Sequence, residues 1–279
     1  MTERPFITFL TPAYNAADTI AESIASVLKQ EGAPFELVVI DDGSTDDTAA
    51  VAAAAIGNDP RARIVSRRNG GSGAALNTGA AAASGTWLSM VDADDFLADD
   101  ALKKRIAFME AHPGYTLYSF GFVYLDPDGT TDPPLEGRVQ CSVTVDDLLS
   151  FPLIPGNAMF RAEDLEAIGG FHEQCYNEDY DLWIRLLLNG ATHIHQPEPL
   201  YFYRRHPGQK TADLITMRVD DIAILSEVIA TGLLDEHQLH LARRMIATYR
   251  RHTALRRILY KIIGRDRTEA LIRKIRDRA

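Results

Sequence analysis

The chain has 279 residues, 46% hydrophobic and 24% charged, so it can bury a core without help from disulfides or a structural metal. No apolar run approaches the roughly 18 residues of a membrane-spanning helix, and the N-terminus lacks the basic-then-apolar order of a secretory signal. Two cysteines, Cys141 and Cys175, are too few for a disulfide framework. These features predict a cytoplasmic protein of one or two domains.

Charge is distributed unevenly along the chain. The net charge of −10 argues against a nucleic-acid-binding protein. Residues 241–279 hold 13 Lys and Arg against 3 Asp and Glu, a net charge of +10, so the other residues together carry −20. The asymmetry predicts that the basic C-terminal segment has a role separate from that of the rest of the chain.

Four apolar segments in the first hundred residues predict strands, at 6–10, 35–40, 62–66 and 86–91. Helical patterns lie between them. Asp18 is expected to cap the first helix, Thr45 or Asp46 to start the second, and the third is expected over about 73–83. Nearly continuous apolar strands that alternate with helices predict a doubly wound, parallel α/β sheet.

The alternation stops after residue 111. The patterns that follow predict a strand over 115–125, a helix over 144–149 capped by Thr144, a helix over 178–188 closed by Asn189 and Gly190, and short strands at 193–195 and 200–204. From about residue 212 onward the pattern is helical.

Unusual polar residues follow three of the four predicted strands: Pro12-Ala13-Tyr14, Asp41-Asp42 and Asp92-Ala93-Asp94-Asp95. Ligands of open α/β sheets bind beyond the carboxyl ends of the strands, where these segments should meet. A single Asp at a strand end usually belongs to a loop or a helix cap, but five carboxylates at one edge repel one another unless a cation or hydrogen-bond donors compensate. Asp92 and Asp94 offer the hard oxygen ligands that magnesium and manganese prefer.

The Gly-rich turn at residues 69–73 leads into a predicted helix, so its backbone N–H groups could cradle a phosphate. It matches neither of two common phosphate-binding motifs. Leu76 stands where the dinucleotide motif needs a third glycine, and no Gly-Lys-Ser/Thr follows for a P-loop. A dehydrogenase and a P-loop NTPase are therefore disfavoured.

The second half of the chain offers three further groups. The acidic segment 177–183 suits the first turn of a helix, and a carboxylate there could also serve as a general base. His193 and His195 share one face of a strand, but no third ligand lies at motif spacing, so a structural role is favoured over zinc. The segment 203–206 carries cations that a diphosphate would need.

In order and spacing, these motifs resemble family 2 glycosyltransferases of the GT-A fold. The segments that carry the resemblance are 9–15, 39–46, 69–71, 77–79, 91–95, 169–173, 178–182 and 203–206. The resemblance covers about residues 5–210. It implies a GT-A domain over 1–210, with a nucleotide-binding half at 1–112 and an acceptor half at 113–210 that adds a small antiparallel part to the sheet. Residues 211–279 are left as a helical, basic extension.

The resemblance implies an inverting, metal-dependent transfer of a sugar from a nucleotide-diphosphate donor, expected to be a UDP-sugar. The acceptor is expected to be a hydroxyl of a glycan or of a lipid-linked molecule, as in cell-surface polysaccharide synthesis. Asp179 matches the family's catalytic base. Asp92 and Asp94 match its DxD motif and, with His206, are expected to hold Mn²⁺ or Mg²⁺.

The resemblance also implies a donor-binding set. Asp42 would accept the N3–H of uracil, because a carboxylate offers only acceptor sites. The other residues in the expected set are Pro12, Ala13, Tyr14, Asn69, Gly71, Asp92, Ala93 and Arg204. One departure is Leu76, where many family members carry Arg.

Two other functions fit the sequence less well. A nucleotidyltransferase would need a basic Gly-rich loop near the N-terminus, but residues 11–15 contain neither Lys nor Arg. A non-catalytic nucleotide-sugar-binding protein would be signalled by loss of the base or of the Asp pair, and both are present.

The basic extension carries apolar residues at helical spacings between 241 and 263, with arginines filling much of the rest. Such an amphipathic helix is expected either to lie on an anionic membrane, which would place the protein peripherally at the inner face, or to pack on the catalytic domain or on a second copy as a homodimer.

Overall fold

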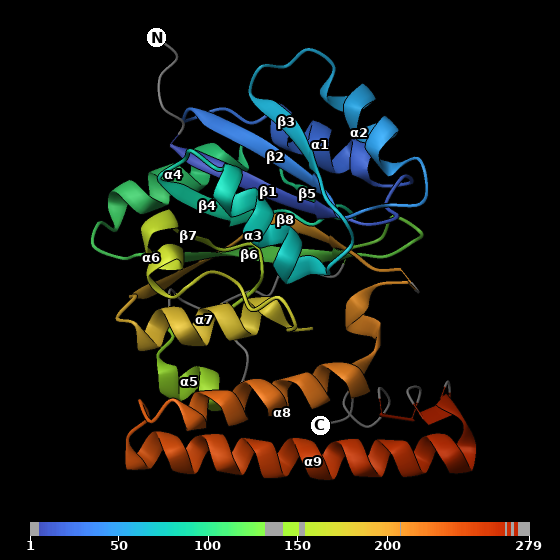
Figure 1. The fold of residues 1–279 in the computed structure, drawn as a ribbon, viewed down its shortest axis with the longest axis vertical. Helices are drawn as coiled ribbons and strands as arrows, with labels where there is room; N and C mark the ends of the chain where they lie inside the picture. Colours follow the sequence, from blue (N-terminus) through green and yellow to red (C-terminus); the bar gives the residue numbers. More distant parts are fainter. Residues whose placement is uncertain are drawn as a thin grey trace. The chain divides into compact units, whose positions relative to one another are not determined.

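The computed structural model describes residues 6–131, 142–150, 154–206, 208–265, 267–268 and 271–272 (Figure 1). Cys141 lies outside the described residues. The chain divides into two compact units. The first comprises Met1–Leu148 and Pro152–Pro207, and the second comprises Leu149–Phe151 and Gly208–Ala279.

The first unit is built on an eight-stranded sheet in the order β3-β2-β1-β4-β7-β6-β8-β5. Its strands are β1 Ile7–Ala13, β2 Phe35–Asp41, β3 Ala62–Ser66, β4 Trp87–Met90, β5 Phe96–Leu97, β6 Leu117–Leu125, β7 Met159–Arg161 and β8 His193–Arg204. The four strands from β3 to β4 are parallel, as predicted. The antiparallel part comes from β7, which is antiparallel to β4 and β6, and from β5, which is antiparallel to β8.

Helices flank the sheet, and both faces of its parallel part are covered (Figure 1). Those before β8 are α1 Ile20–Leu28, α2 Thr48–Ile56, α3 Ser72–Ala82, α4 Ala101–Ala111, α5 Val145–Ser150, α6 Ala162–Ala167 and α7 Glu178–Leu188. Successive residues of β1 face opposite layers. Phe9 belongs to the core cluster that includes Ile24 of α1, whereas Leu10 lies beside Gly79 of α3. A Cβ at Gly79 would come within 2.6 Å of Ile40, so glycine permits the close approach of α3 to β2.

The first two helices begin later than predicted. Asp18 does not cap α1, which starts at Ile20 with Thr19 at its N-cap and no side-chain cap. The predicted start of α2 is also wrong, because the helix begins at Thr48 with Asp47 at its N-cap. The carboxylate of Asp46 instead accepts from the backbone N–H groups of Ala17 (3.2 Å) and Thr48 (3.0 Å). A hydrogen bond from Ala17 to Asp46 therefore joins the loops that precede these two helices.

One long strand, β8, replaces the two short strands predicted at 193–195 and 200–204. It pairs with β6 along both of its ends, and the register shifts on either side of Gly121. A Cβ at Gly121 would lie 2.2 Å from the carbonyl oxygen of Pro197, so the absence of a side chain lets the irregular middle of β8 stay against the sheet.

Glu36 of β2 is buried, and its carboxylate accepts from Thr8, Ser84 and Arg63. Burial alone would raise the pKa of Glu36, but these hydrogen bonds outweigh it and lower the pKa from 4.5 to about 2. Because the folded pKa is depressed, this stabilisation is fully present above pH 4.5 and is lost as the pH falls towards 2.

The variant Glu36→Gln is expected to lower the free energy of unfolding by about 2–3 kcal/mol at neutral pH. Urea denaturation of both proteins from neutral to acidic pH should show the difference shrinking below pH 4.5. Exposed Glu110→Gln serves as the control and should change little. If the difference in unfolding free energy between Glu36→Gln and the native protein stayed constant with pH, the charge-based explanation would be contradicted.

The second unit is helical, as predicted, in the residues that the structure describes. It contains the short 3₁₀ helix η1 Lys210–Ala212 and the helices α8 Leu214–Ala230 and α9 Glu236–Ile263. Asp213 caps α8, and Asp235 forms a capping box with Gln238 at the start of α9. The two helices pack on each other, and Arg218 of α8 lies over the ring of Tyr249 in α9. None of the described helices combines the length and apolar character needed to cross a bilayer.

Candidate active site

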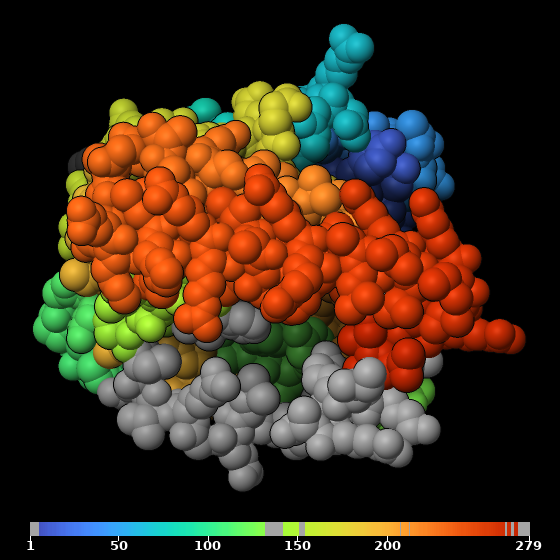
Figure 2. Space-filling model, turned by 90° about the horizontal axis from the view of Figure 1, so that it is seen from below, coloured from blue at the N-terminus to red at the C-terminus, as the bar shows by residue number. Residues whose placement is uncertain are grey.

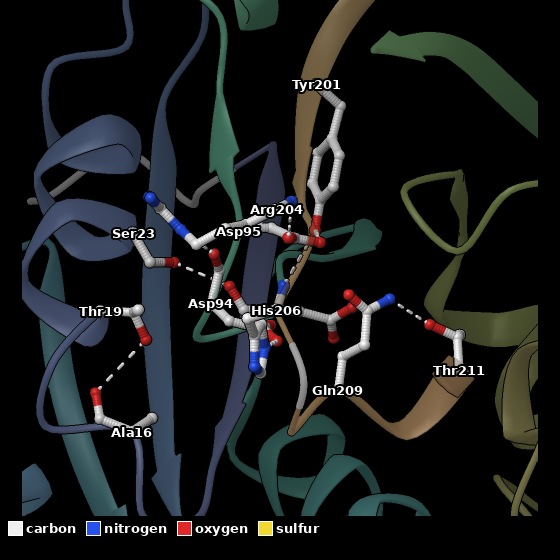
Figure 3. A network of polar contacts seen from close by, with 11 residues as sticks. Ala16, Thr19, Ser23, Asp94, Asp95, Tyr201, Arg204, His206, Gln209 and Thr211 are labelled. Carbon is white, nitrogen blue, oxygen red and sulfur yellow. Dashed lines mark hydrogen bonds and ion pairs between the residues drawn. The ribbon is translucent and has the colours of Figure 1, made fainter. Parts of the chain in front are cut away.

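The clearest site lies in the acidic turn directly after β4 (Figure 3). Ligand atoms from Asp92, Asp94 and Asp95 all lie within 4.8 Å of one another. In the described part of the chain, this is the only cluster of three such side chains close enough to share an ion. Asp92 is exposed, Asp94 is half-buried and Asp95 is buried.

Tyr201 of β8 holds this turn through its hydroxyl (Figure 3). Its hydroxyl donates to Oδ2 of Asp95 at 2.9 Å and accepts from the backbone N–H of Asp92 at 3.1 Å. Tyr201 is buried, and that burial, together with Asp95 and Asp92, raises its pKa well above 10. The hydroxyl therefore stays protonated and fixes both ends of the turn.

Arg204, at the end of β8, holds the same turn by a second route. Its backbone N–H donates to Oδ1 of Asp95 at 2.8 Å, and its Nε donates to the carbonyl oxygen of Asp94 at 2.9 Å. The guanidinium also pairs with Glu22 of α1 at 2.5 Å. The side chain predicted to meet a donor diphosphate thus also supports the acidic turn in this structure.

The chemistry of this turn fits a divalent cation. Burial, followed by the charges of Asp92 and Asp94, raises the pKa of Asp95 to about 9, so the protein alone does not stabilise a third negative charge in this cluster. His206 adds an imidazole, with Nε2 2.8 Å from Oδ2 of Asp94. Since Asp95 is already bonded on both oxygens, Asp92, Asp94 and His206 are the side chains that would hold an ion.

Asp42 lies at the end of β2, where it is buried and meets the Gly-rich turn. Its carboxylate accepts from the N–H groups of Gly70 (3.1 Å) and Gly71 (2.8 Å) and forms an ion pair with Arg67. These two N–H groups are therefore directed at Asp42 and not at a phosphate, and for the rest of the turn the phosphate cradle stays a prediction. The turn instead orients Asp42, whose roughly four acceptor sites leave room for one more donor.

The other predicted donor-binding residues lie at this edge or in the turns beside it. β1 ends in Pro12 and Ala13, and Tyr14 follows with an exposed ring. Asn15 bonds to Ser44 and Thr45, so the loop after β1 is tied to the loop after β2. Asn69 is exposed next to Gly70. The side chain of Ala93 packs in the core, so its backbone is the part that could contact a ligand.

Asp179 lies in the first turn of α7, half-buried. The neighbouring Glu178 accepts a hydrogen bond from Ser72, the first residue of α3, at 2.6 Å. Ser72 belongs to the Gly-rich turn that holds Asp42, so these contacts bring the start of α7 to the edge where β2 ends. A Cβ at Gly156 would lie 3.2 Å from Oδ2 of Asp179, so glycine leaves space beside this carboxylate.

The two strand histidines are structural, as predicted. His193 accepts from the N–H of Val143 at Nδ1, so its Nε2 carries the proton and donates to Ser119, which donates to Nδ1 of His195. Burial, with a smaller effect of His195, lowers the pKa of His193 to about 3, which keeps the ring neutral. Neither ring belongs to a metal-binding group among the residues described.

Comparisons with known proteins agree with this geometry. The family model for glycosyl transferase family 2 matches residues 8–169. The chain is 45% identical to the succinoglycan biosynthesis protein ExoO of Rhizobium meliloti (strain 1021) over 166 residues, covering 57% of this chain and 44% of ExoO. It is 31% identical to the chondroitin synthase of Pasteurella multocida (strain Pm70), covering 65% of this chain and 19% of that protein. The chain thus spans less than half the length of either relative.

Two solved glycosyltransferases share the fold. Residues 1–349 of S. aureus TarS, in complex with UDP-GlcNAc, superpose with a TM-score of 0.71 at 21% identity, covering 92% of this chain and 75% of TarS. The mannosyltransferase PcManGT of Pyrobaculum calidifontis, in complex with GDP-Man and Mn²⁺, gives 0.70 at 22% identity, covering 98% and 80%. The fold is GT-A, and the chain belongs to glycosyl transferase family 2.

Proposed function

We propose that this protein is an inverting, metal-dependent glycosyltransferase that moves a sugar from a UDP-sugar to a hydroxyl of a glycan or of a lipid-linked acceptor in polysaccharide synthesis. The observation that carries the proposal is the acidic turn after β4, held by β8 and joined by His206. Two relatives named for polysaccharide synthesis, ExoO and chondroitin synthase, support the pathway class.

The metal-binding residues in this proposal are Asp92, Asp94 and His206, and the ion is Mn²⁺ or Mg²⁺. When bound, the ion would stabilise the negative charge that develops on the departing nucleotide diphosphate. Asp95 is a positioning residue, because its buried carboxylate links the turn to Tyr201 and to the backbone of Arg204.

Asp179 is the proposed general base. It would take the proton from the acceptor hydroxyl as that oxygen attacks the anomeric carbon, on the side opposite the departing diphosphate. A general base typically contributes about 10²–10⁴-fold to the rate. The configuration of the anomeric carbon is inverted, because the acceptor oxygen displaces the diphosphate in a single step.

The donor is proposed to lie across the ends of β1, β2 and β4. Asp42 would accept the N3–H of the uracil, and Tyr14 would contact the base with its exposed ring. The other residues proposed to line the donor are Pro12, Ala13, Asn69, Gly71, Asp92, Ala93 through its backbone, and Arg204.

Release of nucleotide from a panel of UDP- and GDP-sugars, with Mn²⁺ or with EDTA, tests the proposal. We expect slow hydrolysis of one or more UDP-sugars with Mn²⁺ and none with EDTA. A protein that neither releases nucleotide nor gains thermal stability with any nucleotide-sugar would contradict it. A response to GDP-sugars alone would contradict the assignment of uracil as the nucleobase of the donor.

The variant Asp42→Asn is expected to weaken UDP binding by about tenfold or more, because a hydrogen bond to a charged acceptor is lost. GDP binding, measured by calorimetry beside it, should change much less. Asp59→Asn, an equal charge change at a half-buried carboxylate paired with Arg61, is the matched control. Equal weakening of UDP and GDP would show that Asp42 supports the loop and does not select the base.

A further inference from the structure

The outer face of α9 carries an exposed apolar stripe. Leu255, Ile258 and Ile262 are 54%, 53% and 71% exposed, and their spacings of three and four residues place them on one side of the helix. The buried residues of α9 include Tyr249 and Thr253. Leu255 lies two residues after Thr253, about 200° around the helix, so the stripe points away from the packed side.

The part of the sequence that carries this stripe is rich in cations and contains no carboxylates. Between residues 237 and 265 the sequence has no Asp or Glu and eight basic residues, namely Arg243, Arg244, Arg250, Arg251, Arg256, Arg257, Lys261 and Arg265. Six of them, Arg243, Arg244, Arg250, Arg251, Arg257 and Lys261, are exposed and form no ion pair with any carboxylate that the structure describes. Figure 2 looks onto this unit, where the orange to red atoms belong to α8 and α9.

We propose that the outer face of α9 binds the surface of an anionic lipid bilayer, with Leu255, Ile258 and Ile262 inserted at the headgroup boundary. A helix with exposed aliphatic residues between arginines fits such a surface, because apolar burial and attraction to anionic lipids act together. This binding is separate from the proposed transferase chemistry and does not depend on it.

A second copy of the chain fits the same face less well. In a two-fold dimer the same patch meets itself, so two clusters of unpaired cations would face each other. Like charges brought together across an interface are unfavourable, and α9 supplies no carboxylate between residues 237 and 265 to offset them. An anionic bilayer supplies the missing negative charge.

Flotation of the full chain with vesicles tests the proposal. One set contains phosphatidylcholine alone, and the other also contains phosphatidylglycerol. We expect binding only to the anionic vesicles, and release in roughly 1 M salt, where screening acts over about 3 Å. The variant Leu255→Ser/Ile258→Ser/Ile262→Ser should bind at least about tenfold more weakly. Each of the single variants Arg250→Gln, Arg251→Gln and Arg257→Gln should weaken vesicle binding about fivefold.

Leu233→Ser is the matched control, because Leu233 is exposed in the turn before α9 and lies outside the stripe. It should float like the native protein, and all variants should keep the native circular dichroism. The proposal is wrong if the native chain ignores anionic vesicles at low salt, or if the triple serine variant floats normally. A triple variant that floats as well as the native chain, but is a monomer in light scattering where the native chain is a dimer, would show that the stripe is a dimer interface.

Discussion

Asp94→Asn is expected to abolish sugar transfer, with a loss in kcat/KM of at least about 10²-fold, while the protein stays folded. Asp94 is half-buried, and its carboxylate faces His206 rather than the core. Replacing it by a neutral amide removes one charged oxygen ligand from the set proposed for the ion. Turnover as a function of Mn²⁺ concentration measures the effect, and the shift in melting temperature on adding Mn²⁺ measures ion binding without catalysis.

Asp99→Asn is the matched control for this variant. Asp99 is an exposed carboxylate that pairs with Lys29, outside the acidic turn, so its loss should leave turnover and the Mn²⁺ response unchanged. Near-normal turnover of Asp94→Asn at ordinary Mn²⁺ concentrations would show that Asp94 does not hold the ion.

Asp179→Asn is expected to lower kcat by about 10²–10⁴-fold with little change in UDP affinity. The proposed base contacts the acceptor and not the nucleotide, so the loss should appear in turnover alone. Steady-state rates together with calorimetric titration of UDP separate the two effects. If UDP binding fell sharply while turnover per bound donor stayed normal, Asp179 would belong to the donor site.

The same helix offers a control in Asp181, two residues further on. Asp181 is buried and pairs with the largely buried Arg185 at 2.6 Å, so Asp181→Asn leaves this cation without its carboxylate. We expect this variant to lose about 3 kcal/mol of stability while its folded fraction keeps normal turnover. The two neighbouring carboxylates of α7 should therefore separate catalysis from stability.

The parallel half of the sheet was predictable because its strands are nearly continuous apolar segments that alternate with helices. No comparable apolar segment marks β7, which is three residues long, or β5, which is two. Helix α4 was missed for a different reason. It buries Arg105 completely, with the guanidinium over the ring of Phe120, so a residue typical of surfaces occupies a core position and obscures the apolar pattern.

In the candidate site, the strand-end carboxylates were predictable, but the side chains that hold them were not. Glu22 pairs with Arg204 across 182 positions, and Tyr201 reaches Asp95 across 106. No local pattern links residues so far apart. The pairing of Asp42 with Arg67 was also missed, because an Arg that follows a strand ordinarily indicates only a solvated turn.

The way β8 holds the acidic turn bears on when the site forms during synthesis. The segment 92–95 leaves the ribosome long before Tyr201 and Arg204, and contacts between such distant segments form only after a large loop has closed. A nascent chain that ends before β8 therefore carries three neighbouring carboxylates with neither the hydroxyl nor the backbone N–H that holds Asp95. The parallel half of the sheet can assemble first, and the ion-binding geometry is completed only when the last strand joins.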